Sequence, residues 1–319
     1  MVKLTRRAAI VASSVALASP AVAQDKPLRI VLGLPPGATI DTITRIVAEK
    51  MSKTLGRPVV VDNKTGASGI VANMAVKSAA PDGSTLLMSA LGPIAIFPHT
   101  YARLDYDPFK DFVPVAHVAS FQLAFGTGPK VPATTLDEYV ALAKRGGPYT
   151  DFATPATGSL PQFFGLMFAK AAGIELTHVP YKGGAPVTQA LMAGEIAAAV
   201  LALSDLGELA RSGKVHILAT SGARRSPQYP DVPTFKESGY DIEGSPWYAL
   251  FAPAGTPKEV VDRLAAAAID AVHQPDLNER LGPLGLEPTG LGPAELAAIV
   301  RADSDKWGPI IRASGFKAD

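Results

Sequence analysis

Three glycine-containing loops in this chain have residue types suited to holding an anion. They span residues 35–41, 154–160 and 180–185, and each follows a short apolar run and precedes a segment with helical spacing of apolar residues. The first amide groups of a helix have no partner within the helix, and the helix dipole adds roughly half a positive charge there. A carboxylate or phosphate is therefore stabilised without a basic side chain, where glycine lets the backbone come close.

The candidate ligand-binding residues lie in these loops. They are Gly37, Ala38, Thr39 and Asp41 in the first, Thr157, Gly158 and Ser159 in the second, and Tyr181, Lys182 and Gly183 in the third. Asp41 has a competing and more common role as a helix cap that holds its loop in place. Lys182 either pairs with a ligand carboxylate or is merely solvated, and Tyr181 is suited to an aromatic wall or a hydroxyl donor.

Patterns for other chemistry are weak. The histidines lack metal-ligand spacing, and Ser68 and Ser159 lie in no Gly-x-Ser-x-Gly elbow. The glycine loops match neither the phosphate-binding loop of nucleotide hydrolases nor the dinucleotide-binding fingerprint. We therefore predict no catalytic residue, no metal and no cofactor. The histidines are His99, His117, His178, His216 and His273.

The start of the chain has the pattern of a cleaved export signal. Lys3, Arg6 and Arg7 precede an apolar stretch, and small residues end it, which predicts a signal peptide of residues 1–23 cut after Ala23 and a periplasmic mature protein. The general and the twin-arginine export routes both remain open. No other stretch reaches the ~20 apolar residues of a membrane span.

Composition narrows the possible partners. The 319-residue chain has no cysteine, so disulfides and thiolate metal sites are excluded. Removing the three basic signal residues from 30 Lys and Arg leaves 27 against 29 acidic residues, a formal charge of about −2. Nucleic acid is therefore not an expected partner.

Strand-like and helical segments alternate along the chain, which predicts an α/β fold with mostly parallel sheets. Capping boxes predict helix starts at Thr135 with Glu138, and at Thr256 with Glu259. A terminal helix is expected over 293–314, ended by Gly315. Trp247 is expected in the core, whereas Tyr248 either borders a cleft or is core.

Taken together, the loops resemble those of the Bug-type, or TctC-like, periplasmic binding proteins of tripartite tricarboxylate transporters. The stretches that carry the resemblance are residues 35–41, 61–69, 81–86, 107–112, 179–186, 230–234 and 252–257, in this order over the mature chain. The resemblance implies a two-lobed flytrap with mostly parallel sheets and a cleft that closes on its ligand. Lobe I would comprise residues 25–124 and 248–319, and lobe II residues 125–247.

The resemblance also implies a function and a mode of binding. In the family, loops matching 35–41 and 154–159 act as pincers that hold a ligand carboxylate, and the loop matching Tyr181 to Gly184 borders the cleft. The implied partners are a small carboxylate (dicarboxylate, tricarboxylate or aromatic acid) and the large and small permease subunits. The chain would be a monomeric, non-catalytic receptor.

Two departures from the family pattern bear on the ligand. Ser159-Leu160-Pro161 lacks the histidine that relatives often place there, and residues 195–201 lack the aspartate usual after Gly194. A less polar far side of the cleft favours a carboxylate with an apolar or aromatic body. Two alternatives stay open: a secreted hydrolase of carboxylate esters, and a ligand-dependent partner of a sensor kinase.

Overall fold

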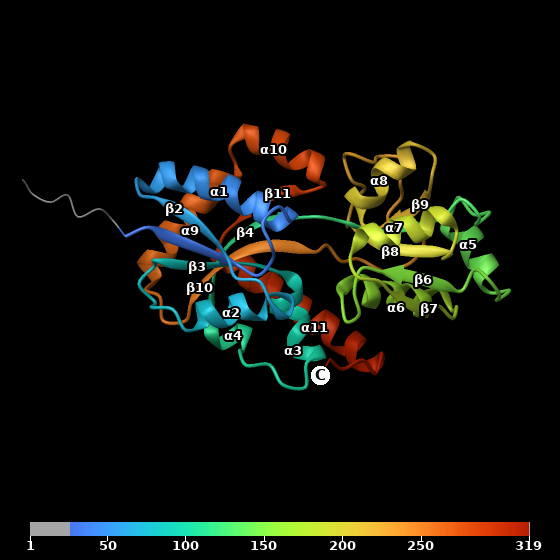
Figure 1. Cartoon of the computed structure of the whole chain (residues 1–319), viewed down its shortest axis with the longest axis horizontal. Helices are drawn as coiled ribbons and strands as arrows, with labels where there is room; N and C mark the ends of the chain where they lie inside the picture. The colour runs from blue at the N-terminus through green and yellow to red at the C-terminus, as the bar shows by residue number, and fades with distance from the viewer. Residues whose placement is uncertain (1–25, 319) are drawn as a thin grey trace, which may run out of the picture.

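The computed structural model describes residues 26–318. The predicted signal peptide and its cleavage after Ala23 lie outside the described residues. Figure 1 shows two lobes side by side, each built on its own sheet with helices packed against it. The predicted α/β, two-lobed architecture is confirmed.

Lobe I contains a six-stranded sheet in the order β11-β4-β10-β3-β1-β2. Its strands are β1 (Leu28–Leu32), β2 (Val59–Asn63), β3 (Thr85–Ala90), β4 (Phe112–Ser120), β10 (Trp247–Pro253) and β11 (Glu287–Leu291). Its helices are α1 (Thr39–Leu55), α2 (Ile70–Lys77), α3 (Phe97–Thr100), α4 (Pro108–Asp111), α9 (Lys258–Val272), α10 (Pro275–Leu281) and α11 (Pro293–Ala313), with short turns η1 (Ala67–Gly69), η2 (Gly92–Ile96) and η3 (Gly282–Leu284).

Lobe II contains a five-stranded sheet in the order β7-β6-β8-β5-β9. Its strands are β5 (Leu123–Thr127), β6 (Asp151–Thr154), β7 (Thr177–Pro180), β8 (Ala198–Ala202) and β9 (His216–Thr220). Its helices are α5 (Leu136–Ala143), α6 (Leu160–Ala172), α7 (Gly184–Ala193) and α8 (Leu203–Arg211).

Most strands of each sheet run in one direction, and β5 and β10, two of the three exceptions, lie where the chain changes lobes. β1, β2, β3 and β4 run together against β10 and β11, whereas in lobe II only β5 runs against its neighbours. β5 receives the chain from lobe I and β10 receives it on its return. We propose residues 25–124 with 248–319, and 125–247, as the approximate extents of the lobes. The sheets differ from these bounds by one or two residues, because β5 begins at Leu123 and β10 at Trp247.

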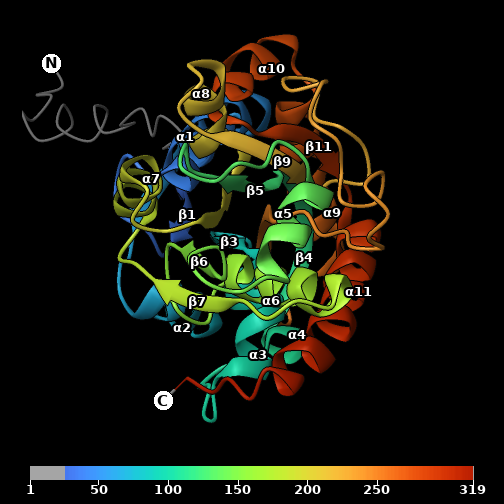
Figure 2. The same ribbon diagram turned by 90° about the vertical axis from the view of Figure 1, so that its right-hand side faces the viewer.

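Aromatic residues make the core of lobe II. The ring of Phe125 on β5 lies 5.1 Å from that of Tyr139 and 5.0 Å from that of Phe168, both edge to face. Trp247 is 1% exposed, so the prediction that it is core is confirmed, and its Nε1 donates to Asp303 at 2.7 Å. The apolar core continues from lobe II onto α11, which Figure 2 shows running along the side of the molecule.

One of the two predicted helix capping boxes is present in the structure. Thr135 and Glu138 form the predicted capping box of α5. The box predicted at Thr256 is wrong: Pro257 holds the N-cap position of α9, and the Thr256 hydroxyl donates to the Pro253 carbonyl at 2.8 Å. The terminal helix is confirmed as α11. Over residues 26–318, no helix combines the length and apolarity needed to cross a bilayer.

Candidate functional site

The three predicted loops lie at the carboxyl ends of strands in both lobes. The first joins β1 to α1 in lobe I, and the other two precede α6 and α7 in lobe II. Figure 1 shows the β1–α1 loop and the starts of α6 and α7 on the facing sides of the lobes. In open α/β sheets this edge is where ligands bind, because strand ends and helix starts meet there.

The first loop is held by Asp41. This carboxylate, 3% exposed, accepts hydrogen bonds from the Gly37 amide (2.9 Å), the Arg45 Nε (3.0 Å) and the Asn63 Nδ2 (2.9 Å). Ala38 occupies the N-cap position of α1, so Asp41 acts from the third helical residue rather than as the N-cap. It holds the loop in place, and its oxygens are already used within the protein.

The pKa of Asp41 reflects this network. Burial raises it, but the hydrogen bonds from Arg45, Gly37 and Asn63 and the charge of Arg45 outweigh burial and lower the pKa to about 2. The carboxylate is therefore ionised at any physiological pH and keeps the loop in one conformation.

Free donors lie next to Asp41 at the start of α1. Among the described residues, the amides of Thr39 and Ile40 donate to no protein acceptor, as expected for a first helical turn. Gly37 has φ +88°, and a Cβ built on it would meet no atom within 4 Å, so this face of the loop is open. The amide of Gly37 itself donates to Asp41, so Thr39 and Ile40 are among the donors that remain available.

The second and third loops are tied to each other. The Tyr181 amide donates to the Thr154 carbonyl (2.9 Å) and the Gly183 amide to the Pro155 carbonyl (2.8 Å). Both loops follow neighbouring parallel strands, β6 and β7, which explains their meeting. The structure thus brings the predicted residues of lobe II together and places those of lobe I in the opposite lobe.

Within the second loop, some predicted donors already make hydrogen bonds within the protein and others do not. The Gly158 amide donates to the Gln162 Oε1 (2.6 Å), and the Ser159 hydroxyl donates to the Ala156 carbonyl (2.7 Å). Thr157 is exposed, and its hydroxyl makes no hydrogen bond to any described residue. In the third loop, Lys182 is exposed and pairs with no carboxylate among residues 26–318.

Asp205 adds an acidic group that sequence reasoning missed. It lies in the first turn of α8, directly after β8, and its Oδ2 is 3.2 Å from where a Cβ on Gly184 would be. Asp205 is exposed as a residue. The protein atoms around its carboxylate nevertheless displace part of the water, and this desolvation raises its pKa. Asp205 therefore supplies a polar group near this strand end, and a less polar far side of the cleft stays a prediction.

Tyr248 lies near Asp205 on the crossing strand. It is half-buried, and its ring lies 5.3 Å from that of Phe121, in the segment where the chain enters lobe II. Burial, with the nearby charge of Asp205 contributing, raises the pKa of its hydroxyl. Tyr248 is thus placed at the junction of the lobes.

A cavity of about 200 Å³ opens beside the first loop. Gly33 and Gly69 pack backbone to backbone at its wall, since a Cβ on Gly33 would be 2.3 Å from the Gly69 Cα. Ala67 and Ser68 adopt positive φ values of 44° and 53° there, a costly conformation for residues with a Cβ. The only sequence signal near this cavity is the pair of glycines in the 66–69 loop.

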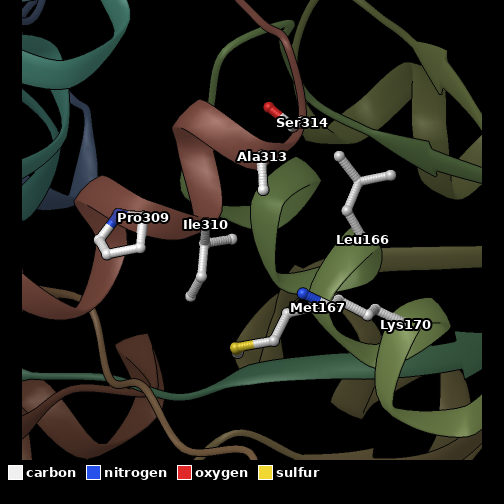
Figure 3. A pocket seen from close by; sticks show the side chains of 7 residues that line it. All are labelled: Leu166, Met167, Lys170, Pro309, Ile310, Ala313 and Ser314. Carbon is white, nitrogen blue, oxygen red and sulfur yellow. The ribbon is translucent and has the colours of Figure 1, made fainter.

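A larger cavity of about 360 Å³ lies elsewhere, between α6 and α11. Figure 3 shows Met167 and Lys170 of α6 opposite Pro309 and Ile310 of α11. Leu166, the first α6 residue in its wall, is six residues beyond the start of that helix, or ~9 Å along its axis. This cavity contains none of the predicted ligand contacts.

The hydroxyl groups of the second loop make hydrogen bonds within the protein. The hydroxyls of Thr154 and Ser159 both donate to the Ala156 carbonyl; Thr154 also contacts the His178 Nε2 at 2.7 Å but is fully buried. Neither hydroxyl is presented as a nucleophile beside a free base. Among residues 26–318, no three His, Asp or Glu side chains are grouped to hold a metal ion.

Comparison with known proteins gives a consistent result. The sequence profile described as the tripartite tricarboxylate transporter family receptor, TctC, matches residues 43–316. Protein BugT of Bordetella pertussis is 31% identical over 92% of this chain and 90% of its own. These matches cover both lobes.

Two solved structures extend the likeness to three dimensions. Rpa4515 of R. palustris, solved with adipate, is 28% identical, with a TM-score of 0.79 over 91% of this chain and 98% of its own. MatC (Rpa3494) from Rhodopseudomonas palustris, with bound malate, is 31% identical, with a TM-score of 0.74 over 89% of this chain and 98% of its own.

Proposed function

The chain belongs to the tripartite tricarboxylate transporter receptor family, as a Bug-type, TctC-like periplasmic binding protein, and from this premise we propose that it captures a small organic carboxylate between its lobes. The loaded protein would then deliver the ligand to the large and small membrane subunits of a tripartite transporter. It would act as a monomer in the periplasm, after removal of residues 1–23, and without catalysis.

The observation that carries this proposal is the pair of helix starts, of α1 and α6, on the facing sides of the two lobes. Thr39 and Ile40 present unpaired amides at α1, and the start of α6 presents the exposed Thr157 with Ser159. Amides that are already fixed bind an anion without reorganisation, and closing the lobes would surround the carboxylate with donors. The similar structures from R. palustris hold adipate and malate, both carboxylates.

The proposed roles of the predicted residues differ. Thr39 would donate directly, with Gly37 and Ala38 allowing close approach, whereas Asp41 would position the loop. Thr157, Gly158 and Ser159 would form the opposing pincer. Tyr181, Lys182 and Gly183 would border the ligand from the neighbouring loop.

The test compares two glycines with matched backbones. Gly37 and Gly239 have φ values of +88° and +86°, and a Cβ on either would meet no atom within 4 Å. Valine is strained at both positions, so Gly37→Val and Gly239→Val should cost similar stability, whereas only Gly37→Val blocks the approach of a ligand to α1.

We expect one or more carboxylates from a panel of dicarboxylates, tricarboxylates and aromatic acids to stabilise the wild-type protein. At 100 times the dissociation constant the gain is about 2.7 kcal/mol, or several degrees in a thermal shift. Calorimetry should show at least tenfold weaker binding for Gly37→Val and unchanged binding for Gly239→Val. The proposal fails if no acid binds protein freed of co-purified ligand by unfolding and refolding, or if Gly37→Val binds normally.

A further inference from the structure

The cavity beside the first loop has an apolar wall and a few polar groups. Leu34, Ile40, Met88 and Pro93 supply apolar surface, drawn from the first loop, β3 and η2. The polar side chains in its wall are Ser68, Asn73 and Ser89. Ile40 also belongs to the first turn of α1, so the cavity adjoins the amides proposed to hold the carboxylate.

Asn73 is the unusual member of this wall. It lies on the buried face of α2 with Ala72 and Val76, is 1% exposed, and its Nδ2 is buried without a hydrogen-bond partner among the described residues. A buried amide donor without a partner destabilises a protein, so its presence calls for an explanation. The Asn73 side chain lies beside the Tyr106 hydroxyl, which donates its own proton to the Pro93 carbonyl at 2.7 Å.

Charge limits what can fill the cavity. No lysine, arginine or histidine lines it. Arg45, one turn after Asp41 on α1, is held by the Asp41 carboxylate and by the Asn63 Oδ1 (3.0 Å). A second ligand carboxylate would therefore be buried here without a counter-ion, which is far more costly than burying an uncharged oxygen that is hydrogen-bonded.

The volume of the cavity limits the size of the ligand that it can hold. An apolar cavity of ~150 Å³ holds a benzene ring. The cavity of about 200 Å³ therefore has room for a six-carbon body ending in one polar atom.

We propose that the ligand is a monocarboxylate with an apolar body and an uncharged hydroxyl or carbonyl group at its far end, and that Asn73 hydrogen-bonds to this group in the lobe I cavity. Asn73 is thus a specificity-determining residue. The inference rests on the proposed function, because the carboxylate end must be held at α1 for the far end to reach the cavity.

The test uses two series of acids that differ only at the far end. One series is benzoate, 4-hydroxybenzoate and terephthalate; the other is hexanoate, 6-hydroxyhexanoate and adipate. Calorimetry on the wild-type protein should show, in at least one series, the hydroxy acid binding at least tenfold more tightly than both the unsubstituted acid and the diacid.

Variants connect this preference to Asn73. In Asn73→Leu, which keeps the size but removes the amide, the hydroxy acid should bind no more tightly than the unsubstituted acid; Asn73→Ala serves if the leucine variant does not fold. Asn278→Leu on α10, an exposed position, and Tyr106→Phe, which removes the neighbouring hydroxyl, should both retain the preference.

The outcomes separate the two proposals. Wild-type preference for the diacid, or a hydroxy-acid preference that survives in Asn73→Leu and Asn73→Ala, overturns the role of Asn73. If these same acids bind and Gly37→Val weakens them, the receptor function still stands. Absence of binding by every acid in wild-type protein overturns both.

Discussion

Asp41 shows how one side chain organises the loop that we propose to bind the ligand. Its oxygens join the loop amide of Gly37 to Arg45 of α1 and Asn63 of β2. Losing the carboxylate would leave the Gly37 amide and the Asn63 amide short of an acceptor in a largely buried site. Such losses cost ~1–3 kcal/mol per unsatisfied group.

We predict that Asp41→Ala lowers the free energy of unfolding by about 2 kcal/mol at pH 7 and weakens carboxylate binding through a loosened loop. Urea denaturation measures the first effect and calorimetry the second. Asp241→Ala, at a side chain 94% exposed, is the matched control and should change neither. An Asp41→Ala protein as stable as wild type would contradict the structural role.

The same residue predicts a pH dependence. The pKa of Asp41 falls from 3.8 to about 2 on folding, so its stabilisation is complete above pH 3.8 and is lost as the pH falls towards 2. The stability difference between wild type and Asp41→Ala should therefore shrink over this range. Denaturant titrations of both proteins at pH 5, 4, 3 and 2.5 measure it, and a difference that stays constant with pH would count against it.

At the scale of elements, β4 pairs with both β10 and β11, and His117 on β4 is buried where the three strands meet. The Nδ1 of His117 lies 2.6 Å from the Thr289 hydroxyl, and the ring lies 5.9 Å from that of Trp247. Burial lowers the pKa of His117 from 6.5 to about 4, since a charged imidazole would be poorly solvated there.

A depressed histidine pKa means that the folded state binds its proton less readily than the unfolded chain. The stabilisation is present above pH 6.5 and is lost as the pH falls towards 4, with a loss of up to about 3 kcal/mol. We predict that His117→Gln flattens the stability profile between pH 6.5 and 4, whereas the exposed His216→Gln does not. An unchanged slope in His117→Gln would refute the assignment.

At the scale of the whole molecule, the C-terminal tail links the lobes at the 154–159 loop, the second of the two pincers that we propose. The Phe316 ring lies 5.8 Å from that of Phe163 on α6, and a Cβ on Gly158 would be 2.6 Å from Phe316. Two residues later, the Ala318 amide donates to the Thr100 carbonyl of α3 in lobe I at 2.7 Å. The pincer loop of lobe II is therefore packed against a segment anchored in lobe I.

We predict that Gly158→Ala destabilises the protein and weakens ligand binding, because the new methyl group displaces Phe316 and Gly158 has φ +69°. Phe316→Ala removes the clash but leaves the φ strain. A double-mutant cycle in urea should therefore show a coupling of at least ~0.5 kcal/mol between the two sites. Additive effects would mean that the tail does not support the loop.

The sequence alone was sufficient for the fold class, for the loops that open α1, α6 and α7, and for the family. These features depend on local patterns: strand and helix periodicity, and glycine or proline at helix starts, which neighbouring residues determine. The capping box predicted at Thr256 was wrong because Pro257, one residue later, is the N-cap of α9.

Only the tertiary structure showed which groups in those loops are free. The Asp41 carboxylate accepts from Asn63, 22 residues away, and the Gly158 amide donates to Gln162. Asp205, in the helix that follows β8, brings a carboxylate close to Gly184. The cavity of Asn73 arises where η1, α2 and β3 meet. Such contacts depend on the order of strands in the sheet and on packing between distant segments, neither of which leaves a local pattern in the sequence.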